Sequence, residues 1–187
     1  MINLSGHRVK ILCEDNSHFY FLQGVFEALS ANVSDRDKSF KKMPNGEGCG
    51  AQTVLTGFKD LADAAVRNNN RENIVYAAII DGDGDSFEHK KQELYSSIIR
   101  GVKQRIEAMD KFFIAIPRKN IETWLMFCSG AQNGADVLLN EETDYKHSGM
   151  RIKPKQAGRW LIGKLRKGTL NCRALDSLAK FCEQFIR

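Results

Sequence analysis

The chain has 187 residues, of which 42% are apolar, so it can build a hydrophobic core and is not disordered by composition. Its net charge of +5 is unevenly distributed. Up to Tyr145 there are 17 basic and 21 acidic residues, whereas the 42 residues from Lys146 to Arg187 include 11 basic and only 2 acidic ones. This excludes a uniformly basic surface and predicts an acidic domain over residues 1–145 with a basic C-terminal appendage over residues 146–187.

Two further classes of protein are excluded early. No apolar run reaches the roughly 18 to 20 residues that span a bilayer, and the N-terminus lacks a signal-peptide pattern, so we expect a cytoplasmic protein without a membrane partner. The five cysteines are odd in number and never form a Cys-x-x-Cys pair. A zinc ribbon and a disulfide framework are therefore not expected.

Strands and helices alternate along the acidic domain. In chain order the patterns predict a strand at Val9–Cys13, a helix at Phe19–Leu29, a short strand near Phe40, a helix at Val54–Val66, a buried strand at Ile74–Ile80, one long helix at Phe87–Met109, a strand at Phe112–Ile116 and a helix at Ile121–Gly130. This order predicts an α/β fold with a mostly parallel sheet and helices on both faces. In such folds the functional site lies beyond the carboxyl ends of the strands.

The basic appendage has helical periodicity as well. Apolar residues recur at helical spacing over Lys155–Arg166 and Cys172–Ile186, which predicts two helices packed on the domain. Their basic residues must then face outward.

Three aspartates follow the strongest predicted strand directly. Asp81, Asp83 and Asp85 alternate with Gly82 and Gly84, so in an extended segment they project to one side within about 7 Å of each other. Carboxylates this close repel, and a divalent cation such as Mg²⁺ or Mn²⁺ would compensate their charge. A solvated acidic loop is the alternative.

Two other kinds of site also contain closely spaced aspartates and can be compared with this segment. A calcium EF-hand loop would need Gly and Glu where the chain has Ser86 and Gln92, so it is excluded. A haloacid-dehalogenase-type phosphatase also places an aspartate pair after a strand, but it usually continues with Thr or Val where this chain has Asp85. That phosphatase is kept as a weaker alternative.

Glu14 ends the first predicted strand as Asp81 ends a later one. If the two strands are parallel neighbours, both carboxylates reach the same crevice. Alternatively, Glu14 is a favourable acid at a helix N-terminus, where Asp15 or Ser17 could cap the following helix.

The order strand, Glu14, helix, and later strand, Asp81-Gly82-Asp83-Gly84-Asp85, resembles the Toprim domain of topoisomerases, primases and overcoming-lysogenization-defect nucleases. The segment from Ile116 to Leu125 is similar to one in small stand-alone Toprim-like proteins that carries a glutamate close to a tryptophan; here these are Glu122 and Trp124. The resemblance covers residues 9–130. It implies a Rossmann-like Toprim fold with the basic helical appendage added to it.

The resemblance also implies a chemistry. Glu14, Asp81 and Asp83 would be catalytic, and together with Asp85 and Glu122 they would hold Mg²⁺ or Mn²⁺ for phosphodiester cleavage. The alternative for Glu122 is an exposed acid on its helix. A lysine would stabilise charge, with Lys146 as the candidate and Lys153 and Lys155 as alternatives. His18 stands where the family commonly has an acid, and it is either a replacement ligand or a structural residue.

A further set of basic residues lies in a stretch without acids and is the expected contact for nucleic-acid phosphates, with DNA as the expected form. These residues are Lys153, Lys155, Arg159, Arg166 and Lys167. A solvated surface or an acidic protein partner is the alternative. The glycine-rich stretch Asn45–Gly50 has no Gly-Lys-Ser/Thr ending, so it is interpreted as a surface loop and not as a nucleotide-binding P-loop.

Together these features predict an Mg²⁺-dependent nuclease, which by family analogy works with a separate ATPase partner in anti-phage defence. The alternative of another class is a non-catalytic Toprim-like module that binds nucleic acid or a partner protein.

Overall fold

The computed structural model describes residues 1–34, 36, 38–39, 50–69, 73–132, 141, 153–171 and 175–186. In chain order its elements are β1 (Arg8–Cys13), α1 (Asn16–Ala28), β2 (Lys38–Ser39), α2 (Gly50–Asn68), β3 (Ile74–Ile79), α3 (Phe87–Ser96), α4 (Arg100–Glu107), β4 (Phe112–Ala115), α5 (Ile121–Gln132), α6 (Pro154–Arg166) and α7 (Asp176–Glu183). Within these described ranges, no helix combines the length and the apolar character needed to cross a bilayer.

The four strands form one parallel sheet in the order β2-β1-β3-β4. This confirms the predicted α/β class with an open, Rossmann-like parallel sheet. The register of the two central strands runs from Arg8 opposite Ile74 to Cys13 opposite Ile79. Because β1 and β3 are parallel, in register and adjacent, the residues that follow each strand emerge side by side at the carboxyl edge.

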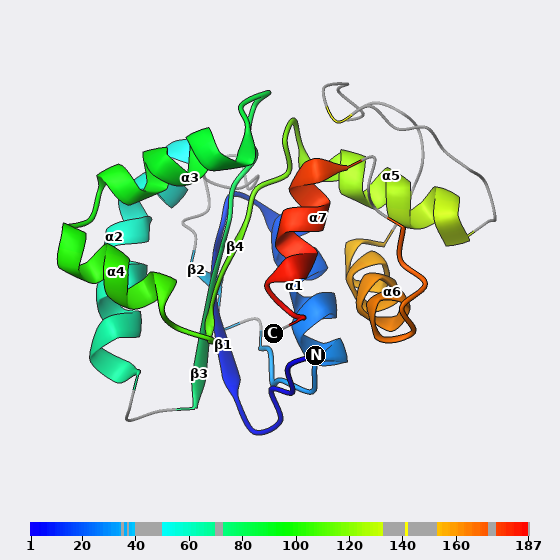
Figure 1. Cartoon of the computed structure of the whole chain (residues 1–187), viewed down its shortest axis with the longest axis horizontal. Helices are drawn as coiled ribbons and strands as arrows, with labels where there is room; N and C mark the ends of the chain where they lie inside the picture. The colour runs from blue at the N-terminus through cyan, green and yellow to red at the C-terminus, as the bar shows by residue number, and fades with distance from the viewer. Residues whose placement is uncertain are drawn as a thin grey trace.

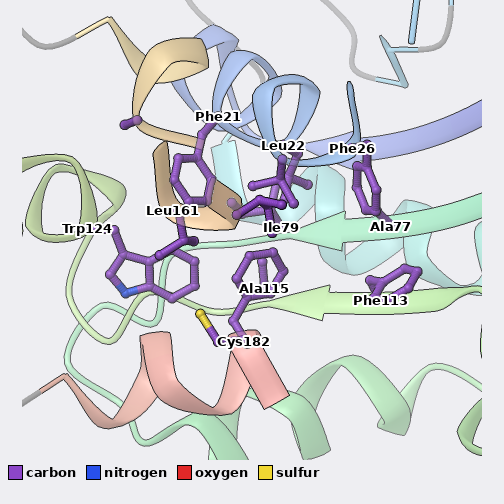
Figure 2. Packing of buried hydrophobic residues seen from close by; sticks show 14 of the residues in the cluster. Phe21, Leu22, Phe26, Ala77, Ile79, Phe113, Ala115, Trp124, Leu161 and Cys182 are labelled. Carbon is purple, nitrogen blue, oxygen red and sulfur yellow. The ribbon is translucent and has the colours of Figure 1, made fainter. Parts of the chain in front are cut away.

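The strands bury side chains on both faces of the sheet, as their continuous apolar sequences predict. One face packs against α1, α5, α6 and α7, and the other packs against α2, α3 and α4 (Figure 1). Along β3 the residues alternate, so Ala77 and Ile79 belong to the first cluster while Ala78 and Ile80 belong to the second. Figure 2 shows the first cluster, in which Trp124 on α5 lies close to Phe21 on α1.

The single long helix predicted over Phe87–Met109 is wrong, because the structure has two helices, α3 and α4, in its place. The break follows Ser96 and Ser97, whose hydroxyls donate to the carbonyl oxygens of Glu93 and Leu94 instead of leaving those acceptors to the helix. Ile99 is then extended before α4 begins. Helix α7 is also shorter than predicted, since it begins at Asp176 and ends at Glu183.

The two C-terminal helices belong to the same hydrophobic core as the sheet. Leu161 and Ile162 of α6 and Leu178 and Phe181 of α7 are fully buried in the first cluster. The predicted boundary between residues 145 and 146 lies outside the described residues, so the structure shows the helices packed on the domain without showing that boundary.

Helices α1 and α6 approach each other through two glycines. A Cβ at Gly24 would overlap the backbone carbonyl of Lys155, and a Cβ at Gly158 would overlap that of Phe21. The helix backbones are therefore in direct contact, and a side chain at either position would force α6 away from the core.

We predict that Gly158→Ala destabilises the protein by about 1–3 kcal/mol, the range for overpacking a close contact. Gly163→Ala, on the same helix, has no atom within 4 Å of the added Cβ and should stabilise the protein by about 0.5–1 kcal/mol through helix propensity. Urea unfolding of both variants measures the difference. Equal effects of the two substitutions would contradict the close crossing.

Candidate metal centre

Two carboxylates meet at the carboxyl edge of the sheet. Glu14 directly follows β1, and Asp81 follows β3 by two residues. The Asp81 backbone N–H donates to Glu14 Oε1 at 2.7 Å, so the hydrogen bond joins the two strand ends. The geometry satisfies the simplest condition for a shared cation, because carboxylate oxygens of Glu14 and Asp81 lie within 4.8 Å of each other across the neighbouring strands.

His18 joins these carboxylates from the first turns of α1. Asp15 caps that helix by accepting the His18 backbone N–H, and its Oδ1 also lies 2.7 Å from His18 Nδ1. On the other side of the ring, His18 Nε2 lies 2.9 Å from Asp81 Oδ1. The imidazole is 1% exposed, so both ring nitrogens are held by carboxylates in a buried position.

This arrangement favours a doubly protonated ring. Burial by itself would lower the pKa of His18, but the charge of Asp81 and the hydrogen bonds to Asp15 and Asp81 outweigh burial and raise that pKa well above its usual value of 6.5. Burial would likewise raise the pKa of Asp15, yet the hydrogen bond and charge of His18 lower it to about 2. Asp15 and Asp81 therefore hold an imidazolium between them.

The geometry fits a divalent cation. One ligand atom each from Glu14, His18 and Asp81 lies within 4.8 Å of the other two. Two ligands at 2.0–2.6 Å from one ion are separated by at most about 5 Å, so these atoms could share a single ion. A mixed oxygen and nitrogen donor set suits Mn²⁺ or Zn²⁺, but His18 could join it only if the ion displaced the proton on its coordinating nitrogen; Mg²⁺ or Mn²⁺ bound through the carboxylates would leave the imidazolium in place.

Glu122, in the first turn of α5, lies close enough to this cluster to be affected by the charges of Asp81 and His18, although it is not one of the three groups within 4.8 Å of one another. Its Oε2 is buried and has no hydrogen-bond partner among the described residues. Burial raises the pKa of Glu122, and the nearby charge of Asp81 raises it further. A buried carboxylate oxygen without a partner is costly, so a cation beside Asp81 would supply the missing interaction.

The loop after β3 is fixed by a close backbone contact with the loop after β4. The N–H of Gly82 donates to Pro117 C=O and the N–H of Gly84 donates to Arg118 C=O, each at 2.7 Å. A Cβ at Gly82 would lie 2.6 Å from the Arg118 carbonyl oxygen, so this position needs glycine. Asp83 has a φ of +55°, and the chain turns back there.

This turn separates the three aspartates that the sequence places together. Asp81 is in the cluster, whereas Asp83 is exposed and reaches Glu14 only through its charge. Asp85 faces α3 instead, where its Oδ2 lies 3.1 Å from Nδ1 of the exposed His89. The expectation of one extended triplet projecting to the same side is wrong, because the left-handed residue and the glycines form a turn.

The predicted basic residues do not all share one environment. Lys155 and Arg159 both bind the carboxylate of Glu27, at 2.8 and 2.7 Å. Glu27 is nine residues beyond His18, which is about 13 Å further along α1. Lys153, Arg166 and Lys167 are exposed at the two ends of α6. The predicted catalytic Lys146 lies outside the described residues, as do most of the residues in Asn45–Gly50.

Two features of the site were missed in the sequence. Asp15 was considered only as a helix cap, although its second role is to bind the ring of His18. Arg118 and Lys119 lie in the loop that packs on Gly82–Gly84, which brings two cationic residues to the edge of the cluster. These two cations precede Glu122, itself a candidate ligand, by four and three residues, and this proximity is the signal that the sequence offers.

The chain matches no protein-family model, no curated protein and no solved structure. The resemblance to Toprim domains rests on the motifs described above and stays a prediction.

We predict that Gly82→Ala displaces the loop that positions Asp81 and lowers the free energy of unfolding by about 1–3 kcal/mol, because the new Cβ would meet two backbone carbonyls. Gly101→Ala in α4 is the matched control, since nothing lies within 4 Å of its Cβ. Chemical denaturation compares them. A Gly82→Ala variant as stable as the control would contradict the contact between the two loops.

We also predict that His18 titrates above pH 6.5, because Asp15 and Asp81 stabilise its charged form. Its contribution to stability is then complete below pH 6.5 and is lost as the pH rises through the folded-state pKa. Long-range ¹H–¹⁵N spectra of the ring nitrogens follow this titration directly. Asp81→Asn should lower the midpoint, and a wild-type midpoint at or below 6.5 would show that the imidazolium is not held.

Proposed function

We propose that this protein is a Toprim-like, divalent-metal-dependent nuclease that cleaves phosphodiester bonds in nucleic acid. The observation that supports this most strongly is the meeting of ligand atoms from Glu14, His18 and Asp81 within 4.8 Å at the carboxyl edge of a parallel sheet. In open α/β sheets this edge is where functional sites lie. The unpaired buried oxygen of Glu122 adds independent support for a cation there.

Each residue has a defined role in the proposed reaction. Glu14 and Asp81 would hold the cation, with Glu122 completing the ligand set. When bound, a divalent cation polarises the phosphoryl group and activates a water molecule for in-line attack. Asp83, which is exposed on the turn, would orient water or a second cation at the mouth of the site.

Cationic residues would bind the polyanion. Arg118 and Lys119 are the described cations in the loop that packs directly on the Asp81 turn, so they would contact the phosphates nearest to the scissile bond. The exposed Arg166 and Lys167 at the end of α6 would bind phosphates further along the strand. Lys155 and Arg159 would contribute less, because Glu27 already neutralises part of their charge.

The partner of this activity follows from the resemblance alone. Members of the overcoming-lysogenization-defect family couple a Toprim nuclease to an ATPase, and this chain has no Gly-Lys-Ser/Thr motif of its own. We propose that energy-dependent control, and a role in anti-phage defence, would come through a separate ATPase.

One observation favours a second candidate function, a non-catalytic Toprim-like binding module. His18 already compensates the charges of Asp15 and Asp81, so these two carboxylates are stable without a cation. In such a module Glu14 and Glu122 would remain as half-buried acids, for which partial burial has raised the pKa. The haloacid-dehalogenase-type phosphatase is less well supported, because its aspartate pair would need both Asp81 and Asp83, and only Asp81 belongs to the group of ligand atoms within 4.8 Å.

Cleavage assays separate these functions. We predict that the purified protein nicks supercoiled plasmid and cuts end-labelled single-stranded DNA in Mn²⁺ or Mg²⁺, with no cleavage in EDTA. Asp81→Asn and Glu122→Gln should each lower the rate by about a hundredfold or more, since both groups would stabilise charge in the transition state. Asp60→Asn, an exposed aspartate on α2, is the matched control and should retain full activity.

The outcomes differ clearly. A wild-type protein that binds Mn²⁺ and DNA but leaves both substrates intact would favour the binding module. Activity that survives Asp81→Asn would place the nuclease, if any, elsewhere in the chain.

A further inference from the structure

A cavity of about 490 Å³ lies along β4, the strand at one edge of the sheet. Figure 1 shows β4 between α3 and α4 on one side and α7 on the other. The floor of this groove is apolar and comes from α3, α4, β4 and the connection between α4 and β4. Its residues are Phe87, Tyr95, Ile106, Met109, Phe112 and Ile114, and none is more than 9% exposed.

The open side of β4 carries an unusual partner. Along a strand, successive residues direct their backbone N–H and C=O groups to opposite sides. On β4 the carbonyl groups of Lys111 and Ala115 accept hydrogen bonds on the side of β3. The N–H and C=O of Ile114, which precedes Ala115, therefore point to the other side, away from the sheet. The side chain of Gln184 meets both of those groups: Ile114 N–H donates to Oε1 at 3.0 Å, and Nε2 donates to Ile114 C=O at 2.8 Å. A carboxamide carries the same donor and acceptor as a peptide group. Gln184 thus occupies the place that a peptide group of a fifth strand would take.

We propose that this groove is a docking site for an extended, basic peptide segment of a partner protein. The segment adds a strand to β4 and replaces the Gln184 carboxamide on Ile114 with its own backbone, the mode known as β-augmentation. None of the proposed metal-binding residues lines the groove, and the docking proposal does not depend on the proposed nuclease activity.

The side chains of the segment follow from the pleat. Successive residues of a strand point to opposite faces, and Phe112 and Ile114 both face the apolar floor. Every second residue of an added strand would therefore enter the cavity, and apolar side chains fit there. The intervening residues would face α7, where Glu183 is exposed and Lys180 is half-buried.

The charge of the rim selects basic residues. Three exposed glutamates, Glu88, Glu107 and Glu183, border the groove together with two lysines, Lys91 and Lys180, so its charged lining is net negative by one. Lys180 lies 3.2 Å from Asp176 and 3.7 Å from Glu88, so its charge is already shared with carboxylates. Aromatic rings of the floor also hold ammonium groups in this structure, because Lys180 Nζ lies 5.7 Å from the Phe87 ring centroid and Lys91 Nζ lies 5.5 Å from that of Tyr95. These two rings already have ammonium groups of this chain beside them, so a lysine of the partner would bind to the glutamates of the rim.

The recessed position of β4 favours a peptide over a second copy of this chain. Helices border the strand on both sides, and the same helices would border β4 in another copy. Two such edges would meet helix against helix before their strands could pair. A single extended segment is narrow enough to reach Ile114.

The test uses two fluorescein-labelled, acetylated hexapeptides in which valine alternates with lysine or, in the matched control, with glutamate. Fluorescence polarisation measures their affinity for the full chain. We expect the lysine peptide to bind about tenfold more tightly than the glutamate peptide, because it meets the glutamate rim. The net charge of the protein is +5, so non-specific attraction would produce the opposite preference.

Three variants locate the binding. Glu107→Trp covers the rim and should weaken binding of the lysine peptide about tenfold or more, whereas Asp60→Trp, outside the groove, should not change it. Gln184→Ala removes the competing carboxamide and should tighten binding several-fold; thermal melting verifies that each variant is folded.

The proposal would be overturned by any of four results. These are preference for the glutamate peptide, equal affinity of Glu107→Trp and Asp60→Trp, unchanged affinity of Gln184→Ala, and a concentration-dependent dimer that Glu107→Trp abolishes. The last result would show that a second copy occupies the groove.

Discussion

The parallel pairing of β1 with β3 is the constraint on which the rest of the candidate site depends. Residues 8–13 lie opposite residues 74–79 without a register shift, so the chain leaves both strands at the same height. Glu14 and Asp81 are 67 positions apart, yet one backbone N–H joins them directly. A shift of one residue along either strand would turn a side chain from one face of the sheet to the other and would separate these carboxylates.

Two helices and one turn then complete the cluster. Helix α1 begins with Asp15 as its cap, which places His18 one turn later against Asp81. The β4–α5 connection packs on the Gly82 turn and brings Glu122 to the same edge. Helix α6 packs directly on α1 at the glycine contact, so a helix near the C-terminus helps to hold α1, and with it His18, in position. The acidic domain and the basic C-terminal helices therefore share one hydrophobic core.

Sequence patterns were sufficient for the strands, for most helices and for the pairing of Glu14 with Asp81, because these depend on apolar periodicity and on parallel topology. They were insufficient where local backbone geometry decides. The left-handed φ of Asp83 separates three aspartates that alternate in the sequence, and two serine hydroxyls end a helix that periodicity would continue. The ion pairs of Lys155 and Arg159 with Glu27 also escape prediction, since they depend on how α6 crosses α1.

The central claim is that Glu14, Asp81 and Glu122 hold a divalent cation. Crystals grown with Mn²⁺ and measured at a wavelength where manganese scatters anomalously test it directly. The account predicts one anomalous peak within about 2.6 Å of carboxylate oxygens of Glu14 and Asp81, with the Glu122 carboxylate turned toward it. An absence of anomalous density at this edge in saturating Mn²⁺, with His18 still bound to Asp81, would contradict it.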